Sequence, residues 1–365
     1  MSSALAVPLG FLSLRVVAVD RLTDDSVAVE FAQPEGAALR FAPGQHLTVR
    51  RVVAGVEVRR PYSLCTSAGS GRLRIAVKRL PGGALSPFLV DRLRPGAVLE
   101  VLPPAGSFGP RETGPVGRRY ACLAAGSGIA PIASIVATVL ETEPASTVSL
   151  VLGNRTTAEV MLLEELADLK DAYLSRFQLL HVLSREEQPS ALLTGRLDAE
   201  RVAQLLATLL PPETVDQWFL CGPFEMVNGA RGALLGAGVD PARVHLELFH
   251  AEPQQPIQPQ PGPRSATTGV GGAPGGATVQ AALNGRSTTV QVPAGSTVLD
   301  AVLAVRADAP YACRGGVCGT CRARVLVGAV QMAVTYALEP DELAAGIVLT
   351  CQAQPTTPVL RLEYL

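Results

Sequence analysis

Four cysteines in the C-terminal quarter have the spacing best suited to chemistry. Four residues separate the first two, two separate the next pair, and twenty-nine precede the last, at Cys313, Cys318, Cys321 and Cys351. Thiolates are strong metal ligands. Glycines at 315, 316 and 319 lie between them. Because glycine reaches positive φ without steric cost, a tight loop with backbone N–H groups turned toward the sulfur atoms is expected.

This spacing is typical of plant-type [2Fe-2S] clusters, so all four cysteines are predicted to be cluster ligands. A zinc site is one alternative, although structural zinc sites favour paired Cys-x2-Cys spacings or histidines, and no histidine follows His250. A set of unrelated buried thiols is the other alternative.

An Arg-Pro-Tyr-Ser run over 60–63 closes a predicted strand. Tyr62 can stack on a flavin ring, Arg60 can offset diphosphate charge, and the Ser63 hydroxyl can orient flavin N5, which makes Ser63 a candidate catalytic residue. Downstream, a cation, a glycine and a hydroxyl surround a predicted helix start, at Lys78, Gly83 and Ser86. Such groups form phosphate cradles. Ordinary strand packing and a solvated turn are the alternatives.

A glycine-rich run over 124–131 follows a predicted strand and opens a helix. Its glycines let the backbone approach a pyrophosphate, whose charge the helix N-terminus favours. The binding residues expected here are Gly126, Gly128 and Pro131. Cys221 and Gly222 close a later strand at its carboxyl end, where parallel sheets bind ligands. Cys221 is therefore a second candidate catalytic residue, facing a nicotinamide, with a buried structural thiol as the alternative.

Composition narrows the class of protein. The 365 residues are 48% hydrophobic and 17% charged with net charge −1, which argues against a nucleic-acid-binding surface. Seven cysteines, an odd number, fit a reducing cytoplasm better than a secreted disulfide framework. Residues 120–140 carry no charge, but glycines and a proline divide them, so a buried strand, turn and helix are expected rather than a membrane span.

The elements that position these motifs change character along the chain. Short valine- and leucine-rich runs over 15–20, 26–31, 46–53, 56–60, 72–77 and 98–102 predict an antiparallel β-barrel spanning residues 10–112, with one helix over 84–93. Strand-like runs at 120–125, 147–153, 177–184, 217–221 and 244–248 then alternate with helical segments at 132–141, 160–173, 199–209 and 225–235. This alternation predicts an α/β parallel-sheet domain over 113–250.

The remaining chain predicts a linker and a third domain. Prolines and glycines crowd residues 251–276, which indicates an interdomain linker. Asn284-Gly285 between two strand-like runs is a strong hairpin signal. With a helix from Thr297 to about Arg306 and the cysteine loop, residues 277–365 predict a compact α+β domain.

The motifs Arg-x-Tyr-Ser, Gly-Ser-Gly-Ile-Ala-Pro and Cys-Gly-Pro, in this order, resemble the ferredoxin–NADP reductase family, and the last domain resembles a plant-type ferredoxin, a β-grasp fold. The domain order, with the runs over 310–318, 338–346 and 351–353, resembles more narrowly the reductase subunits of phenylacetyl-CoA epoxidases. The resemblance implies FAD at Arg60, Tyr62, Ser63 and Ser86. It implies a nicotinamide dinucleotide at Gly126, Gly128, Pro131, Cys221 and Gly222.

The resemblance further implies electron flow from NADPH through FAD and the [2Fe-2S] cluster to a separate di-iron oxygenase. The charge balance, the cysteine count and the interrupted apolar stretch predict a cytoplasmic protein with no nucleic-acid or membrane partner. Ser184 and Arg185 end the third α/β strand as in a 2′-phosphate site, and Arg155 adds a cation, which favours NADPH over NADH without excluding NADH. A reductase for a ring-hydroxylating or hydrocarbon oxygenase, and a redox sensor or electron carrier, are the alternatives.

Overall fold

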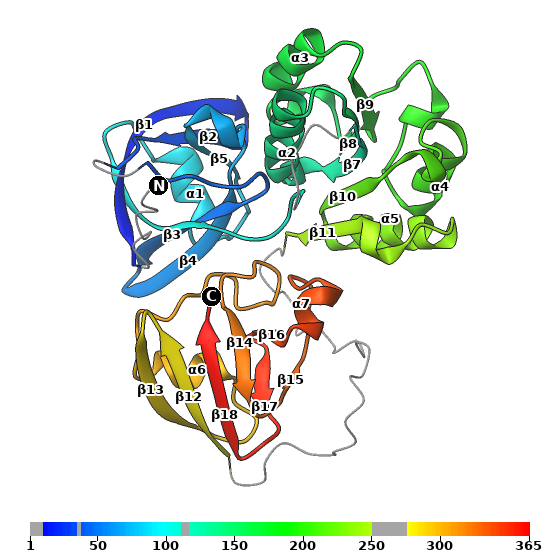
Figure 1. Ribbon diagram of the computed structural model, residues 1–365. Coiled ribbons are helices and arrows are strands. Elements are labelled where there is room, and N and C mark those ends of the chain that lie inside the picture. Colours follow the sequence, from blue (N-terminus) through cyan, green and yellow to red (C-terminus); the bar gives the residue numbers. More distant parts are fainter. Residues whose placement is uncertain (1–9, 35–37, 111–116, 250–275) are drawn as a thin grey trace. The chain divides into compact units, whose positions relative to one another are not determined.

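The computed structural model describes residues 10–34, 38–110, 117–249 and 276–365 (Figure 1). The chain divides into two compact units, Met1–Phe249 and His250–Leu365. The linker expected at 251–276 lies, apart from Gly276, outside the described residues. The barrel and the α/β domain therefore belong to the first unit, and the four predicted cluster cysteines belong to the second.

The N-terminal half of the first unit is the expected antiparallel barrel. Its sheet has the order β4-β3-β6-β1-β2-β5. The strands are β1 (Leu12–Thr23), β2 (Ser26–Phe31), β3 (His46–Val53), β4 (Val56–Ser63), β5 (Leu73–Lys78) and β6 (Val98–Ala105). An antiparallel bridge from Leu64 to Ile75 joins the end of β4 to β5 and closes the barrel. One short helix, α1 (Ser86–Asp91), covers it.

The second half is a five-stranded parallel sheet of order β11-β10-β7-β8-β9. Its strands are β7 (Arg119–Ala125), β8 (Thr147–Asn154), β9 (Phe177–Leu183), β10 (Gln217–Gly222) and β11 (Val244–Leu248), and its helices are α2 (Ile129–Thr142), α3 (Leu163–Ala172), α4 (Ala199–Thr208) and α5 (Phe224–Gly236). The chain leaves β7 in one direction and returns to β10 on its other side. The carboxyl ends of β7 and β10 therefore form a topological switch point, where such sheets bind ligands.

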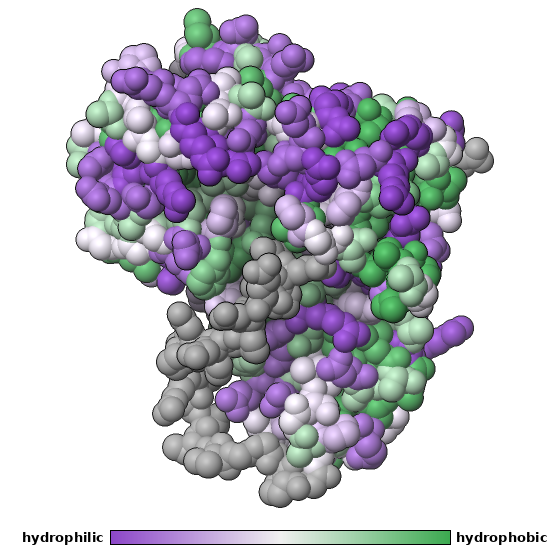
Figure 2. Space-filling view, turned by 180° about the vertical axis from the view of Figure 1, so that it is seen from behind, coloured by the Kyte–Doolittle hydropathy of each residue, from purple (hydrophilic) through white to green (hydrophobic). Residues whose placement is uncertain are grey.

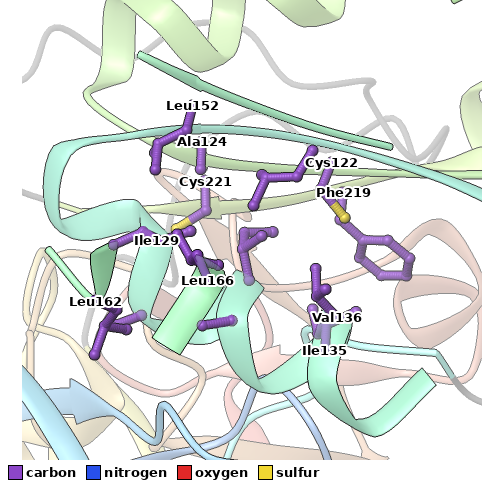
Figure 3. Close-up of a cluster of buried hydrophobic side chains, with 14 of the residues drawn as sticks. Cys122, Ala124, Ile129, Ile135, Val136, Leu152, Leu162, Leu166, Phe219 and Cys221 are labelled. Atoms are coloured by element: carbon purple, nitrogen blue, oxygen red, sulfur yellow. The ribbon is translucent and has the colours of Figure 1, made fainter. Parts of the chain in front are cut away.

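Helix α2 is the central element of this half. Twelve of its fourteen residues are buried, and its side chains form one core cluster with Cys122, Phe219 and Cys221 of the sheet (Figure 3). The uncharged stretch 120–140 thus forms a buried strand, a 3-10 turn and this helix. Among the described residues, no helix has the length and apolarity needed to cross a membrane. The face of the first unit seen in Figure 2 is predominantly hydrophilic.

Helix α3 begins later than the periodicity predicts. The helical pattern starts at residue 160, but Leu162 has a positive φ of 59° and α3 starts only at Leu163. Val160, Met161 and Leu162 are instead buried in the same core cluster as α2. Burial of apolar side chains therefore outweighs local helix propensity here.

The second unit is the expected α+β domain. Its sheet has the order β13-β12-β18-β14-β16, and β15 pairs with β17. The elements are β12 (Ala277–Leu283), β13 (Arg286–Val292), α6 (Val298–Leu303), β14 (Arg322–Val327), β15 (Val330–Met332), α7 (Pro340–Ala344), β16 (Ile347–Leu349), β17 (Ala353–Pro355) and β18 (Val359–Tyr364). Asn284 and Gly285 both have positive φ, 56° and 71°, as a type I′ hairpin requires.

Candidate functional site

The four predicted cluster ligands come together in the second unit as two pairs. The largest influence on the pKa of each thiol is its partner in the pair: Cys318 for Cys313, and Cys351 for Cys321. Among the described residues, no three cysteine, histidine, aspartate or glutamate side chains converge as ligands of one ion. Two thiol pairs match the two irons of a [2Fe-2S] cluster, each of which needs two thiolates.

In each pair, one thiol has a lowered pKa and the other a raised pKa, so one of the two cysteines ionises more readily. The hydrogen bond from Cys318 lowers the pKa of the Cys313 thiol to about 6, with help from backbone N–H groups, including that of Gly315 at 3.3 Å from Sγ. The hydrogen bond with Cys321 likewise lowers the pKa of Cys351. Their partners Cys318 and Cys321 have pKa values raised by the same bonds and by burial. Backbone donors already turned toward sulfur are what an iron–sulfur cluster needs.

The cysteine loop needs glycine at two of the three expected positions. Gly316 and Gly319 have φ of 74° and 67°. A Cβ on Gly316 would lie 2.5 Å from Val334 Cγ2, and one on Gly319 would lie 2.6 Å from Arg322 Nη1. The third positive φ, 56°, belongs to Arg314 rather than to Gly315, which corrects that part of the sequence prediction.

Arg322 ties the cysteine loop to helix α7. Its Nη2 donates to the carbonyl oxygen of Ala337 and lies 3.4 Å from Glu342 Oε2. Glu342 also accepts from the N–H of Glu339 at 2.9 Å, as part of the α7 capping box. Only 13% of the Arg322 side chain is exposed, and its guanidinium lies against Gly319 of the cysteine loop, two residues before the predicted ligand Cys321.

The two nucleotide motifs, far apart in sequence, meet at the switch point of the first unit. A Cβ on Gly128 would lie 2.2 Å from the carbonyl oxygen of Cys221, and one on Gly222 would lie 3.2 Å from the backbone nitrogen of Ala125. Gly126, Gly128 and Pro131 follow β7 through one 3-10 turn into α2. Glycine is therefore required where these backbones touch.

Cys221 lies at this point with its side chain inside the core. The residue is 0% exposed, and its Sγ lies 4.0 Å from Glu247 Oε2 on the neighbouring strand. Burial, and then the negative charge of Glu247, raise its pKa well above the usual value. Figure 3 shows it beside Ala124 and Ile129. Contact of this thiol with a nicotinamide stays a prediction.

Three of the residues predicted to hold FAD, Arg60, Tyr62 and Ser63, lie on β4. Ser63 is buried opposite His46 of β3, and Arg60 donates to the Arg59 carbonyl at 2.9 Å. Tyr62 is half-buried. Leu64, directly after Ser63, bridges to Ile75, so the end of β4 lies beside β5.

The expected phosphate cradle is a compact turn leading into α1. The Ser86 hydroxyl accepts from Leu80 N at 3.0 Å, and Gly83 N donates to the Leu80 carbonyl at 2.9 Å. Lys78 Nζ lies 3.4 Å from Asp25 Oδ2. The lysine is thus paired with a carboxylate of the barrel.

The proposed 2′-phosphate residues lie side by side at the ends of β8 and β9. Ser184 N donates to Asn154 O at 3.0 Å, and Arg185 N donates to Arg155 O at 2.7 Å. The surrounding carboxylates were not expected from the sequence. Arg155 pairs with Glu159, and Glu186 accepts from Thr157 N and Oγ1 at 2.7 and 2.8 Å. These two hydrogen bonds, the backbone one first, lower the Glu186 pKa.

Comparison with known proteins bears out the three-part organisation. Residues 13–109 match the oxidoreductase FAD-binding domain, residues 122–232 the oxidoreductase NAD-binding domain, and residues 281–356 the 2Fe-2S iron-sulfur cluster binding domain. The solved structure of phthalate dioxygenase reductase aligns with 97% of this chain and 98% of its own at a TM-score of 0.56 and 23% identity, which supports the fold.

Two relatives match along almost their whole length. One of the subunits of 1,2-phenylacetyl-CoA epoxidase from Escherichia coli (strain K12) is 43% identical over 97% of this chain and 98% of its own. The ferredoxin reductase component of 3-ketosteroid-9-alpha-monooxygenase from Rhodococcus rhodochrous is 34% identical over 96% of both chains. The chain therefore belongs to the family of FAD-, nicotinamide-nucleotide- and [2Fe-2S]-binding oxygenase reductases that includes this component of 1,2-phenylacetyl-CoA epoxidase.

Proposed function

We propose that this reductase uses NADPH and passes electrons to a separate di-iron oxygenase that acts on phenylacetyl-CoA, in the cytoplasm. One observation carries the choice of acceptor, the 43% identity along 97% of the chain with the epoxidase component of Escherichia coli. No disulfide joins the seven cysteines, all of which lie in the described part of the chain, and this fits a reducing compartment.

The chain's own groups have distinct roles in this proposal. Residues 10–112 hold the flavin through Arg60, Tyr62 and Ser63, with Lys78, Gly83 and Ser86 toward the diphosphate. Residues 113–250 hold the nucleotide against the β7–α2 turn and Gly222. Residues 277–365 hold the cluster on Cys313, Cys318, Cys321 and Cys351. When bound, the flavin would accept the two electrons of a hydride, and the cluster would pass them on one at a time.

The preference for NADPH rests on Ser184, Arg185 and Arg155, whose backbones are joined at the strand ends. A phosphate dianion is attracted by guanidinium groups and by hydroxyl donors. The carboxylates of Glu159 and Glu186 lie at the same place and repel a phosphate. NADH, which lacks the 2′-phosphate, is therefore the competing donor.

An anaerobic titration of the purified protein with NADPH and, separately, NADH tests the donor. Bleaching of flavin and iron–sulfur absorbance at lower NADPH than NADH concentration is expected. Reconstitution with a phenylacetyl-CoA epoxidase oxygenase, and in parallel with a ring-hydroxylating oxygenase and a 3-ketosteroid oxygenase, tests the acceptor. Faster turnover with either of the latter two contradicts the proposed acceptor. Flavin bleaching with no change at the cluster supports the sensor or carrier alternative.

A further inference from the structure

The barrel and the α/β domain share an apolar seam inside the first unit. Cys65, Ala76 and Phe108 of the barrel belong to the same core cluster as α2, and the rings of Phe108 and Phe219 form a T-shaped pair with centroids 5.6 Å apart. Hydrophobic contact is non-directional. The seam alone therefore holds the two domains together without fixing how they are turned.

A first polar contact crosses this seam just after β4. The Ser67 hydroxyl donates to Glu141 Oε2, and the Ala68 N–H donates to Thr138 Oγ1 at 2.9 Å. Ser67 and Thr138 are only 5% and 4% exposed. Thr138 satisfies its own donor on the Ser134 carbonyl at 2.7 Å, so its hydroxyl is fixed in direction before it accepts the barrel's N–H.

A second polar contact crosses at β5. Arg74, 7% exposed, donates through Nη1 to Glu165 Oε1 of α3 at 2.8 Å and through Nη2 to Asp20 Oδ2 of β1 at 3.1 Å. The guanidinium is planar and its donors diverge at fixed angles. It therefore sets the angle between α3 and two barrel strands.

These two contacts connect the parts that hold the two reactants. Ser67 follows Ser63, the proposed flavin residue at the end of β4, by four positions, and α2 starts directly after Gly128 of the nucleotide turn. One contact is made on α2 and the other on α3. Two directional contacts on different helices restrict both sliding and rotation of one domain against the other.

We propose that these side chains form an interdomain clasp of positioning residues that holds the flavin and nicotinamide sites at hydride-transfer distance. The clasp consists of Ser67, Arg74, Thr138, Glu141 and Glu165. Reacting atoms must lie about 3–3.5 Å apart, and a misplacement of about 1 Å costs roughly 100-fold in rate. The inference rests on the proposed placement of flavin at β4 and of nucleotide at the β7–α2 turn.

Two matched pairs of variants in the full-length, cofactor-loaded protein test the clasp. Thr138→Val removes the acceptor of Ala68 N–H with little change of shape, whereas Thr138→Ser keeps it. Arg74→Gln breaks the second contact, whereas Arg72→Gln breaks the pair of Arg72 with Glu30, which lies within the barrel. Glu165 and Asp20 are 42% and 53% exposed, so neither becomes a buried unpaired charge in Arg74→Gln.

Anaerobic stopped-flow reduction by NADPH and by NADH gives the readout. Thr138→Val and Arg74→Gln should each lower the limiting rate of flavin reduction at least tenfold and raise the kinetic isotope effect with [4,4-²H₂]NADPH. Three control quantities should stay within twofold of the wild type: the Kd for NADP⁺, the FAD content and the extent of cluster reduction by dithionite. Hydrogen exchange at Ala68 should accelerate in Thr138→Val. Thr138→Ser and Arg72→Gln should match the wild type.

Unchanged limiting rates in Thr138→Val and Arg74→Gln would overturn the clasp, as would equal losses in Arg72→Gln. If Thr138→Val does not fold, the comparison of Arg74→Gln with Arg72→Gln still tests the clasp. A wrong placement of the cofactors gives a different result, because Ser63→Ala and Gly128→Ala would then leave FAD content and the Kd for NADP⁺ unchanged.

Discussion

Glu159 Oε2 lies 2.5 Å from Nε of Arg155, four residues earlier in the sequence. The cation expected to meet a 2′-phosphate is thus already paired with a carboxylate. Both side chains are partly exposed, 48% for Arg155 and 29% for Glu159. Exposed ion pairs contribute little to stability, roughly 0–1 kcal/mol, so a bound phosphate can displace Glu159 at modest cost.

Glu159→Gln should therefore lower the KM for NADPH by about two- to fivefold, because up to ~1 kcal/mol of competing attraction is removed. Arg155→Gln should raise that KM, and the KM for NADH should stay constant in both. Glu164→Gln, at another exposed carboxylate of the same segment, is the matched control. Equal responses to the two nucleotides would exclude a 2′-phosphate site here.

Cys351→Ser should abolish the iron–sulfur absorbance and its EPR signal, since one iron loses half of its thiolates. Flavin content and NADPH-dependent reduction of ferricyanide should persist, because the flavin domain lies in the other compact unit. Cys65→Ser changes a buried thiol of the first unit and should keep the cluster. Retention of a normal cluster in Cys351→Ser would refute the ligand assignment.

The pair of Arg322 with Glu342 predicts opposite shifts of the cluster midpoint potential. Reduction adds negative charge, so Arg322→Gln should lower the potential and Glu342→Gln should raise it. A change of roughly 1 kcal/mol corresponds to about 40 mV for a one-electron couple. EPR-monitored redox titration measures both, with the exposed Arg324→Gln on the same strand as control. Shifts of the same sign would indicate a purely structural effect.

Burial raises the pKa of Cys65 and of Cys122 to about 12. Both thiols should therefore resist iodoacetamide in the native protein between pH 7 and 9 and react once unfolding returns their pKa to about 8.5. The same shift implies that the stability contributed by the buried neutral thiols is lost as pH rises from about 8.5 toward 12. Mass spectrometry after labelling at pH 8.5, with and without denaturant, checks this, and native alkylation at either position would contradict it.

The sequence by itself determined the elements whose signals are local. Residues 26–31 and 46–53 form β2 and β3 with the predicted bounds, because alternation along a strand is visible in a short window. The Asn284-Gly285 turn and the cysteine spacing are equally local. Strands β14 to β18 were not predicted. Strands β15, β16 and β17 are only three residues long each, β14 has a register shift between Val325 and Val327, and β18 was missed although its residues alternate between exposed and buried.

Only the tertiary structure decided which distant groups meet. The backbone contact of Gly128 with Cys221 and the hydrogen bonds between the Ser67 loop and α2 each join segments about 70 to 95 residues apart. No short window of sequence contains both members of such a pair. Sheet register and the packing of α2 fix these contacts, because a strand shifted by one residue would turn every side chain to the opposite face.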